Sequence, residues 1–191
     1  LGAGQGVDDL LGVFAGTGVG AGLVLDGRMR RGPRGLAGEL GHTFVAFDQF
    51  HDAVVGRGEL EDYAGRASMQ RWVEVASPDE SAFLRGLMGE GRLKSRAWAE
   101  GVDAADPLTL HLIDRARSAL AAAIASVVTL LDVERVVLGG GLAERLGEPF
   151  RAELEAEVAA RAFAGYTAPV VRARLGDTGG AVGAALLLEQ P

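Results

Sequence analysis

The sequence predicts an α/β fold in which a β-hairpin leads a mixed sheet with helices on both faces. Two apolar runs of strand length, Leu10 to Ala15 and Ala21 to Leu25, flank a glycine-rich turn. Apolar residues that recur with the helical period indicate a long helix from about Leu108 to Leu131. After it, the buried-strand pattern of Val133 to Leu138 runs into three glycines and a further helix. Strands and helices that alternate in this way are typical of an α/β domain.

The turn between the first two strands, Gly16-Thr17-Gly18-Val19-Gly20, has the composition of a phosphate-binding turn. Three glycines allow backbone N–H groups to face one way, and the Thr17 hydroxyl adds a further donor. An ordinary glycine-rich hairpin has the same composition, so the turn alone leaves both interpretations open.

A second tight turn and a glycine-punctuated loop follow the hairpin. Asp26-Gly27 has the sequence of a two-residue hairpin turn. The loop after it ends in Glu39 and His42, a carboxylate and an imidazole. These groups suit a polyol, because Glu accepts hydrogen bonds from two hydroxyls and neutral His both donates and accepts.

The segment resembles the signature of the ROK family of sugar kinases and sugar-responsive repressors. In that family a Gly-Thr-Gly-x-Gly turn precedes a Gly-Glu-x-Gly-His segment, as it does here. The resemblance covers most of the chain and implies an actin-like ATPase (ribonuclease H-like) lobe, with sugar contacts from Glu39 and His42. It also implies that the phosphates of ATP bind to Gly16, Thr17, Gly18 and Gly20.

The segment beyond His42 departs from the family pattern. The family carries Cys-x-Cys-Gly-x-x-Gly-Cys-x-Glu here, and its three thiolates join the loop histidine in a structural zinc site. This chain has Asp52, Val54 and Glu59 at the cysteine positions. Because Val54 has no donor atom and carboxylates replace thiolates poorly in a tetrahedral site, we expect no zinc and no other metal site.

Two alternatives remain open for this region. Residues 48–58 form a solvated acidic loop, or His42, His51, Asp52 and Glu59 together recruit a metal ion. The loop follows a short strand expected at Thr43 to Phe47.

Glu61 matches the second sugar-contacting glutamate of the family pattern, at the start of a helix that continues through Trp72. A glutamate in a first helical turn also stabilises the helix dipole, which is its alternative role. Further helices are expected from Ser77-Pro78 and over Arg92 to Glu100. Neither carries chemistry that we can assign.

Gly139, Gly140 and Gly141 place backbone without side chains at the carboxyl end of a strand, where ligands of α/β folds bind. The resemblance implies that this turn lies against the adenosine of ATP. A tight strand–helix connection would use the same glycines. The next helix is expected to start at Pro149 and to bury Phe163. A strand over Val170 to Leu175 and a helix capped by Asp177 end the chain.

Composition excludes several classes of protein. The 191 residues carry a net charge of −7, which gives no long-range attraction to nucleic acid or to an anionic membrane. No apolar run is long enough to cross a membrane, and the absence of cysteine excludes disulfides and thiolate metal sites. We expect a cytoplasmic protein with no membrane partner and no nucleic acid bound through this chain.

The resemblance implies phosphoryl transfer from ATP, with Mg²⁺, to a hexose hydroxyl, with glucose as the expected substrate. The family's catalytic base, an Asp in an Asn-Asp-x-Asn segment before the Gly-Thr-Gly turn, has no match at Asp8 or Asp9. No catalytic residue is therefore expected here. Residues 1–191 are expected to be the carboxyl-terminal lobe, without the amino-terminal lobe, and inactive alone.

Two further functions stay open. The chain could be the sugar-sensing domain of a ROK repressor, whose DNA-binding helices would lie upstream, or a dimerisation module. A homodimer is expected in each case, because the exposed cleft wall and the helix from Leu108 to Leu131 should favour self-association.

Overall fold

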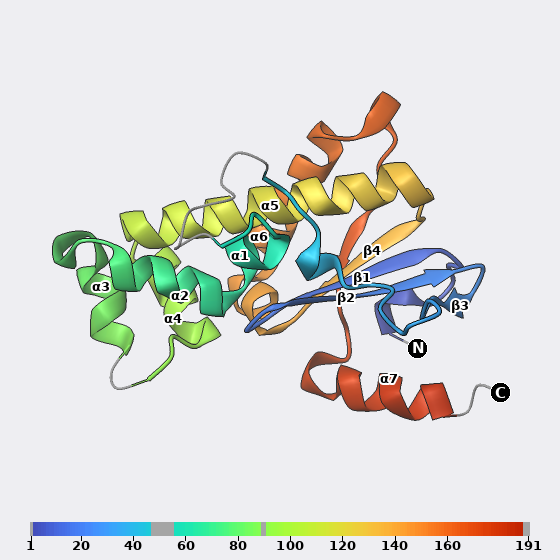
Figure 1. Cartoon of the computed structure of the whole chain (residues 1–191), viewed down its shortest axis with the longest axis horizontal. Coiled ribbons are helices and arrows are strands. Elements are labelled where there is room, and N and C mark those ends of the chain that lie inside the picture. Colours follow the sequence, from blue (N-terminus) through green and yellow to red (C-terminus); the bar gives the residue numbers. More distant parts are fainter. Residues whose placement is uncertain (1, 47–55, 89–90, 189–191) are drawn as a thin grey trace.

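A computed structural model describes residues 2–46, 56–88 and 91–188. Its strands and helices follow one another along the chain as seen in Figure 1. They are η1 (Gly2–Gly4), β1 (Leu10–Ala15), β2 (Val19–Leu25), β3 (Arg28–Met29), η2 (Leu40–His42), α1 (Leu60–Ala64), α2 (Arg66–Val75), α3 (Pro78–Met88), α4 (Ser95–Asp103), α5 (Pro107–Leu131), β4 (Arg135–Gly139), α6 (Gly141–Ala160), η3 (Phe163–Gly165), β5 (Val170–Arg172), η4 (Gly176–Thr178) and α7 (Gly179–Leu188).

The strands of the described residues form one mixed sheet in the order β3-β2-β1-β4-β5. β1 pairs antiparallel with β2, so that Ala15 lies opposite Val19, and parallel with β4, so that Phe14 lies opposite Gly139. β4 in turn pairs parallel with β5. This is the hairpin-led mixed sheet that the sequence predicts. It brings the glycine-rich turn after β1 and the one after β4 to the same end of the sheet.

The turn at Asp26-Gly27 has the predicted hairpin form. Leu25 lies opposite Arg28, and the two residues between them have φ of 54° and 69°. Positive φ at both central positions matches the twist of the flanking strands, and Asp-Gly is a favoured sequence for it. The hairpin therefore fixes the register of β2 and β3.

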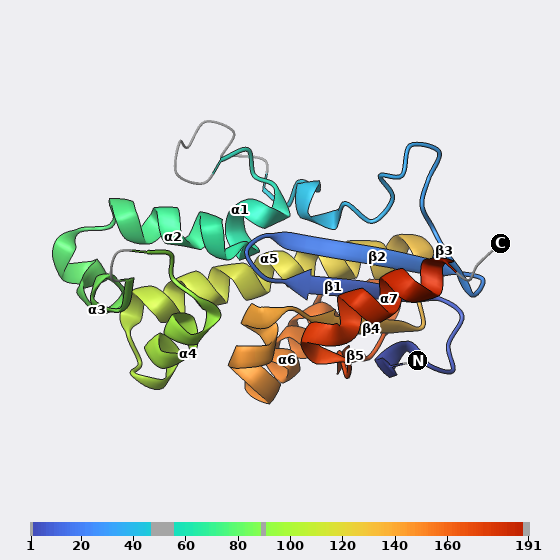
Figure 2. The ribbon, with the colours of Figure 1, turned by 90° about the horizontal axis from the view of Figure 1, so that it is seen from below.

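Most helices cover one face of the sheet. Leu11, Val13 and Ala15 alternate along β1 and are buried in one core with residues of α5 and α6. Phe14 points to the other face and is 47% exposed. Figures 1 and 2 show α5 on one side of the sheet and α7 on the opposite side.

The long helix α5 begins and ends with defined caps. The Asp106 carboxylate accepts hydrogen bonds from the Thr109 N–H at 2.8 Å and the Thr109 hydroxyl at 2.6 Å, and Pro107 occupies the first turn. Asp132 ends the helix in the left-handed conformation. Between these caps the helix carries much of the hydrophobic core, including Leu120 and Ile124.

The helix predicted from Glu61 onward is in fact two helices that meet at Gly65, which has extended backbone angles. A Cβ on Gly65 would lie 2.8 Å from the Glu61 carbonyl oxygen and 3.3 Å from the Gly18 Cα. The break therefore lets the α1–α2 junction pack directly against the first glycine-rich turn.

The prediction of a strand at Thr43 to Phe47 is wrong for the described residues 43–46. Phe44 forms a single bridge with Glu59, and the N–H groups of Val45 and Ala46 both donate to the Gly58 carbonyl. Because two successive N–H groups donate to the same carbonyl, the regular alternation of backbone hydrogen bonds that a β-strand needs is broken. Phe47, His51, Asp52 and Val54 lie outside the described residues.

Other predicted boundaries shift. β2 begins at Val19 rather than Ala21, so Gly20 lies in the strand, and α4 begins at Ser95. The segment that starts at Pro149 is the second part of α6, after a break in helical geometry at Gly147.

The carboxyl-terminal expectations also need correction. β5 spans only Val170–Arg172, and Phe163 is 74% exposed rather than inward, because the chain leaves α6 before reaching it. Asp177 lies inside η4, so that Thr178 directly precedes α7.

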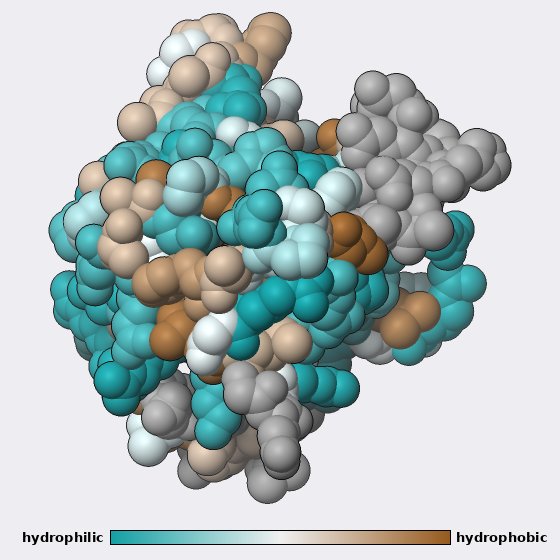
Figure 3. All heavy atoms as spheres, turned by 90° about the vertical axis from the view of Figure 1, so that its left-hand side faces the viewer, coloured by the Kyte–Doolittle hydropathy of each residue, from teal (hydrophilic) through white to brown (hydrophobic). Residues whose placement is uncertain are grey.

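The surface at the end of the molecule formed by α2, α3 and α4 is predominantly hydrophilic, with separate apolar areas (Figure 3). Val75 and Leu87 are among the exposed large apolar residues of this region. Within the described ranges, the helices lack the combination of length and apolar character that a membrane crossing needs.

Two leucines of α5 test this account of the core. Leu120 is fully buried, whereas Leu130 is 81% exposed. Leu120→Ala should lower the free energy of unfolding by about 2–5 kcal/mol, because it removes buried methyl groups and leaves a cavity. Leu130→Ala should change it by less than about 0.5 kcal/mol. Urea unfolding followed by circular dichroism measures both, and equal losses would contradict the assigned core.

Candidate functional site

The first glycine-rich turn spans Gly16 to Gly18 and is attached to the start of α2. The Gly16 N–H donates to the Gly18 carbonyl at 2.8 Å, which closes the turn. The N–H groups of Arg66 and Ala67 donate to the carbonyls of Gly16 (3.1 Å) and Thr17 (3.0 Å). Within the described part of the chain, the N–H groups of Thr17 and Gly18 have no acceptor. The turn thus has its carbonyls bound and two donors available for an anion.

Arg66 adds a positive charge beside this turn. Its guanidinium donates to the Thr17 hydroxyl at 3.0 Å and to the Leu93 carbonyl at 3.3 Å, and its buried Nε has no partner among the described residues. Burial lowers the pKa of the Arg66 guanidinium from its ordinary value, although arginine stays protonated in proteins. A small hollow next to it is lined also by Gln70 and Arg92. The sequence analysis missed Arg66, because only the folded chain brings it to Thr17.

Glu61 binds to the far side of the same turn. Its carboxylate accepts a hydrogen bond from the Val19 N–H at 2.7 Å. A Cβ on Gly18 would collide with this carboxylate, and a Cβ on Gly41 would collide with the Val19 carbonyl. The glycines at these two positions therefore allow α1, the turn and the loop before His42 to approach one another closely.

His42 lies beside the Glu59 carboxylate. Its Nδ1 is 2.9 Å from the Oε2 of Glu59, whose side chain is 16% exposed, whereas that of His42 is 62% exposed. The hydrogen bond from Glu59, its negative charge and the weaker charges of Glu61 and Glu39 raise the pKa of His42 above its ordinary value of 6.5. Glu39 itself is exposed at the start of η2. The Glu61 carboxylate lies close to the loop that carries His42, since a Cβ on Gly41 would lie 3.5 Å from its Oε2, and Glu39 directly precedes the short helix η2 that contains His42.

The second glycine-rich turn adjoins the first one. Gly140 has φ of 89°, and a Cβ there would collide with the Ala15 carbonyl, one residue before Gly16. Gly139 ends β4, where a Cβ would lie 2.8 Å from the Phe14 ring, and Gly141 begins α6. Both glycine-rich turns thus lie at the end of the sheet where the neighbouring strands β1 and β4 finish.

The zinc site of the family pattern does not fit this chain. Val54 offers no donor atom, the cysteine positions hold no thiolate, and the Glu59 carboxylate is hydrogen-bonded to His42. Among the residues with described positions, no group of three His, Cys, Asp or Glu side chains could hold a metal ion. The expectation of no zinc stays a prediction.

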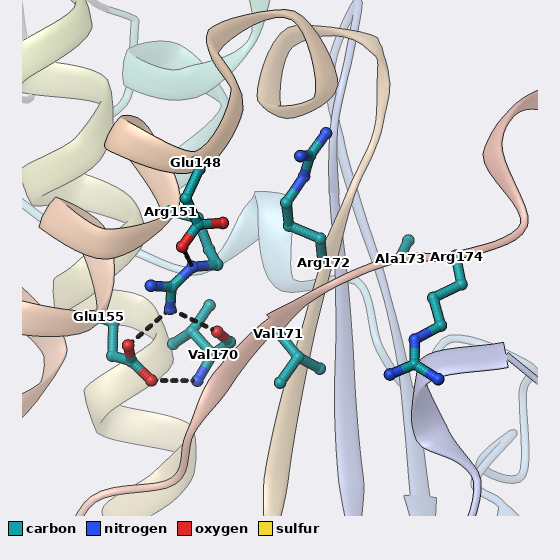
Figure 4. A pocket seen from close by; sticks show the side chains of 8 residues that line it. All are labelled: Glu148, Arg151, Glu155, Val170, Val171, Arg172, Ala173 and Arg174. Atoms are coloured by element: carbon teal, nitrogen blue, oxygen red, sulfur yellow. Dashed lines mark hydrogen bonds and ion pairs between the residues drawn. The ribbon is translucent and has the colours of Figure 1, made fainter.

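A separate hollow lies between α6 and β5 (Figure 4). Arg151 is held within it by Glu148 at 2.6 Å, Glu155 at 2.6 Å and the Val170 carbonyl at 2.8 Å. These contacts pair Arg151 with two carboxylates and join α6 to the edge strand β5, and Arg172 and Arg174 also line the hollow.

The whole chain, residues 1–191, matches the family model described as the ROK family. The chain belongs to the ROK family. This confirms the resemblance of its motifs, and its fold is the actin-like ATPase fold of ROK sugar kinases.

Relatives of known name include both kinases and a regulator. The chain is 33% identical to the N-acetylgalactosamine kinase AgaK of Shewanella sp. (strain ANA-3), over 98% of this chain and 59% of that protein. It resembles the structure of a ROK family glucokinase from Streptomyces griseus in complex with glucose and AMPPNP, with a TM-score of 0.76, 29% identity, and coverage of 97% of this chain and 62% of that one.

A ROK family transcriptional regulator, a homologue of the E. coli MLC protein, has a TM-score of 0.78 and 25% identity, over 99% of this chain and 48% of the regulator. The chain thus spans about three fifths of the length of the kinases and about half that of the regulator.

The pKa of His42 tests the carboxylate cluster. It should exceed 6.5 in a histidine NMR titration and fall toward 6.5 in Glu59→Ala, because the main causes of the increase are the hydrogen bond with the Glu59 carboxylate and the charge of that carboxylate. Glu39→Gln, which removes the weakest contributor, should change it far less. Since the pKa is raised on folding, protonation of His42 stabilises the folded state below pH 6.5, and this stabilisation is lost as the pH rises through the elevated pKa. Equal effects of the two variants would refute the assigned geometry.

Proposed function

We propose that residues 1–191 form the carboxyl-terminal lobe of an ATP-dependent sugar kinase of the glucokinase type, which transfers the γ-phosphoryl group of ATP to a hexose hydroxyl. The observation that supports this most is the hydrogen bond of 2.7 Å between the Glu61 carboxylate and the Val19 N–H. It holds a group suited to sugar hydroxyls against a turn suited to phosphate. A phosphoryl transfer needs these two substrates within contact of each other.

The phosphate turn would bind ATP through donors that the fold leaves available. The N–H groups of Thr17 and Gly18 would donate to phosphate oxygens, and Arg66 would supply positive charge. Because Arg66 donates to the Thr17 oxygen, the Thr17 hydroxyl proton can point at a phosphate oxygen. Gly139, Gly140 and Gly141 would present bare backbone to the adenosine.

The sugar would bind to the carboxylates and imidazole next to the turn. Glu61 uses Oε2 for the Val19 N–H, and no described donor is bonded to its Oε1, which can accept a hydroxyl proton. Glu39 and His42 would hold neighbouring hydroxyls of the same ring. Glucose is the first candidate, and N-acetylated hexosamines are the next, since a relative is named for such a sugar.

The proton-accepting base and part of the phosphate site are proposed to come from an amino-terminal lobe. Kinases of this kind use Mg²⁺, which neutralises the charge that develops on the phosphates.

A sugar-sensing repressor domain is the second candidate, and the resemblance to the ROK regulator favours it. Both functions would use the sugar-binding carboxylates, but only the kinase needs the phosphate turn. Isothermal titration of AMPPNP into the full-length protein that contains this chain separates them: a kinase binds the nucleotide through a turn that Gly18→Val blocks, whereas a sensor binds the sugar alone.

We also propose a cytoplasmic homodimer. Much of α5 is buried against its own chain, but Leu130 and Phe163 remain exposed at the end of α5 and just after α6. Analytical ultracentrifugation of the purified protein measures whether it is a monomer or a dimer.

Glu61→Ala should reduce kcat/KM for the sugar by about tenfold to a hundredfold in the enzyme that contains this chain. A lost hydrogen bond to a charged group costs roughly 1.5–3 kcal/mol, and each 1.36 kcal/mol is about a factor of ten. Asp79→Ala, an exposed acid in the first turn of α3, is the matched control and should retain full activity. A Glu61→Ala enzyme as active as the control would remove Glu61 from the site.

Residues 1–191 alone should give no measurable phosphorylation of glucose in a coupled assay. Loss of a general base alone typically reduces a rate by about 10²–10⁴-fold, and an open half-site also admits water. Gly18→Val serves as the control for contaminating kinase from the host. Turnover by the wild-type chain that disappears in Gly18→Val would refute the placement of the base in another lobe.

A further inference from the structure

Glu59 occupies a cysteine position of the family pattern, and its contact with His42 suggests why a metal can be absent. The carboxylate Oε2 lies 2.9 Å from Nδ1 of His42. We propose that Glu59 is a positioning residue that orients the His42 imidazole toward the sugar by a direct hydrogen bond, in place of the zinc ion of the family pattern. This inference rests on the proposed function, since it concerns the same sugar site.

The backbone on either side holds the two residues together. The Leu60 N–H donates to the Thr43 carbonyl at 2.8 Å, one residue beyond both His42 and Glu59. The Val45 N–H donates to the Gly58 carbonyl at 2.9 Å. These two bonds pair the segment after His42 with the segment around Glu59, so the distance between the two side chains does not depend on their own contact.

Glu59 is fixed further by the start of α1. The Oδ2 atom of Asp62 accepts hydrogen bonds from the N–H groups of Arg57 (2.9 Å), Gly58 (3.1 Å) and Glu59 (3.0 Å). Three donors on one carboxylate oxygen order the backbone that carries Glu59. The side chain of Glu59 is also largely covered, at 16% exposed, whereas His42 is open to solvent. The Glu59 carboxylate is therefore held in place by its surroundings, and it orients the His42 imidazole.

The contact decides which ring nitrogen faces the ligand. An ionised carboxylate has no proton to donate, so Nδ1 of His42 must carry the hydrogen. Nε2 is then the ring nitrogen left for a sugar hydroxyl, as an acceptor when the ring is neutral and as a donor when it is protonated. A metal ion bound to Nδ1 would hold the ring in a similar orientation, but it would occupy the Nδ1 lone pair and leave the hydrogen on Nε2. Glu59 therefore leaves a hydrogen-bond acceptor at Nε2 of the neutral ring, where a metal ion would leave a donor.

The tautomer of His42 is the direct test. In the ¹⁵N-labelled chain above the pKa of His42, we expect Nδ1 to be protonated and Nε2 to be bare, with the signals assigned by a His42→Asn variant. Glu59→Ala should shift His42 to the Nε2–H tautomer that free imidazole side chains favour. Glu59→Gln should retain Nδ1–H, because the amide oxygen still accepts it. The same tautomer in Glu59→Ala as in the wild type would overturn the positioning role.

Sugar binding is measured on the same samples with glucose and N-acetylgalactosamine as probes. Glu59→Ala should weaken binding by about tenfold, as the loss of an outer partner typically does, and Glu59→Gln should recover most of it. EDTA should leave both the tautomer and the affinity of the wild type unchanged. One bound zinc per chain whose removal changes the tautomer would overturn the replacement of zinc by Glu59.

These outcomes separate the two claims. If neither sugar binds to the wild type, the proposed function fails, and the sugar role of Glu59 fails with it. If sugar binds equally well to the wild type and to folded Glu59→Ala, judged by circular dichroism, only the positioning role fails.

Discussion

The attachment of the first glycine-rich turn to the junction of α1 and α2 is the constraint on which the site depends. The start of α2 binds two turn carbonyls, Glu61 binds the Val19 N–H, and Gly65 leaves room for Gly18. A residue with a side chain at Gly18 or Gly65 would force these parts away from each other. These contacts hold the turn, the helices α1 and α2 and the Glu61 side chain together, so the N–H donors of the turn are kept in one direction.

Charge is divided between the two halves of this unit. Arg66 lies on the side of Thr17, whereas Glu59 is hydrogen-bonded to His42, and Glu61 and Glu39 add weaker negative charge. Positive charge and free N–H groups suit a polyphosphate, and carboxylates suit hydroxyl groups. Because both halves contact the same short turn, the chemistry of each is defined within one small region of the fold.

Local patterns in the sequence predicted the parts of the fold that depend on local physics. The hairpin at Asp26-Gly27, the capped helix α5 and the strand before Gly139 follow from turn preference, helical period and capping. The strand expected after His42 failed because the N–H groups of Val45 and Ala46 both donate to the Gly58 carbonyl, a contact that the residue pattern does not reveal. The break at Gly65 was missed because its cause, the approach of Gly18, is tertiary.

The residues of the candidate site likewise fall into those that the sequence predicted and those that only the fold reveals. Glu39, His42 and Glu61 were predicted as sugar contacts from their order and residue type, through the resemblance to the family to which the chain belongs. Arg66 and the partnership of Glu59 with His42 were not found. Each depends on a contact between segments that no spacing rule relates.

The contact between His42 and Glu59 has a consequence for the conditions under which the site can operate. A carboxylate and an imidazole are not oxidised on the ladder that converts a thiolate to sulfenic and then sulfinic acid. The chain contains no cysteine at all. Peroxide and metal depletion, which disable a thiolate–zinc centre, would therefore leave this arrangement chemically unchanged.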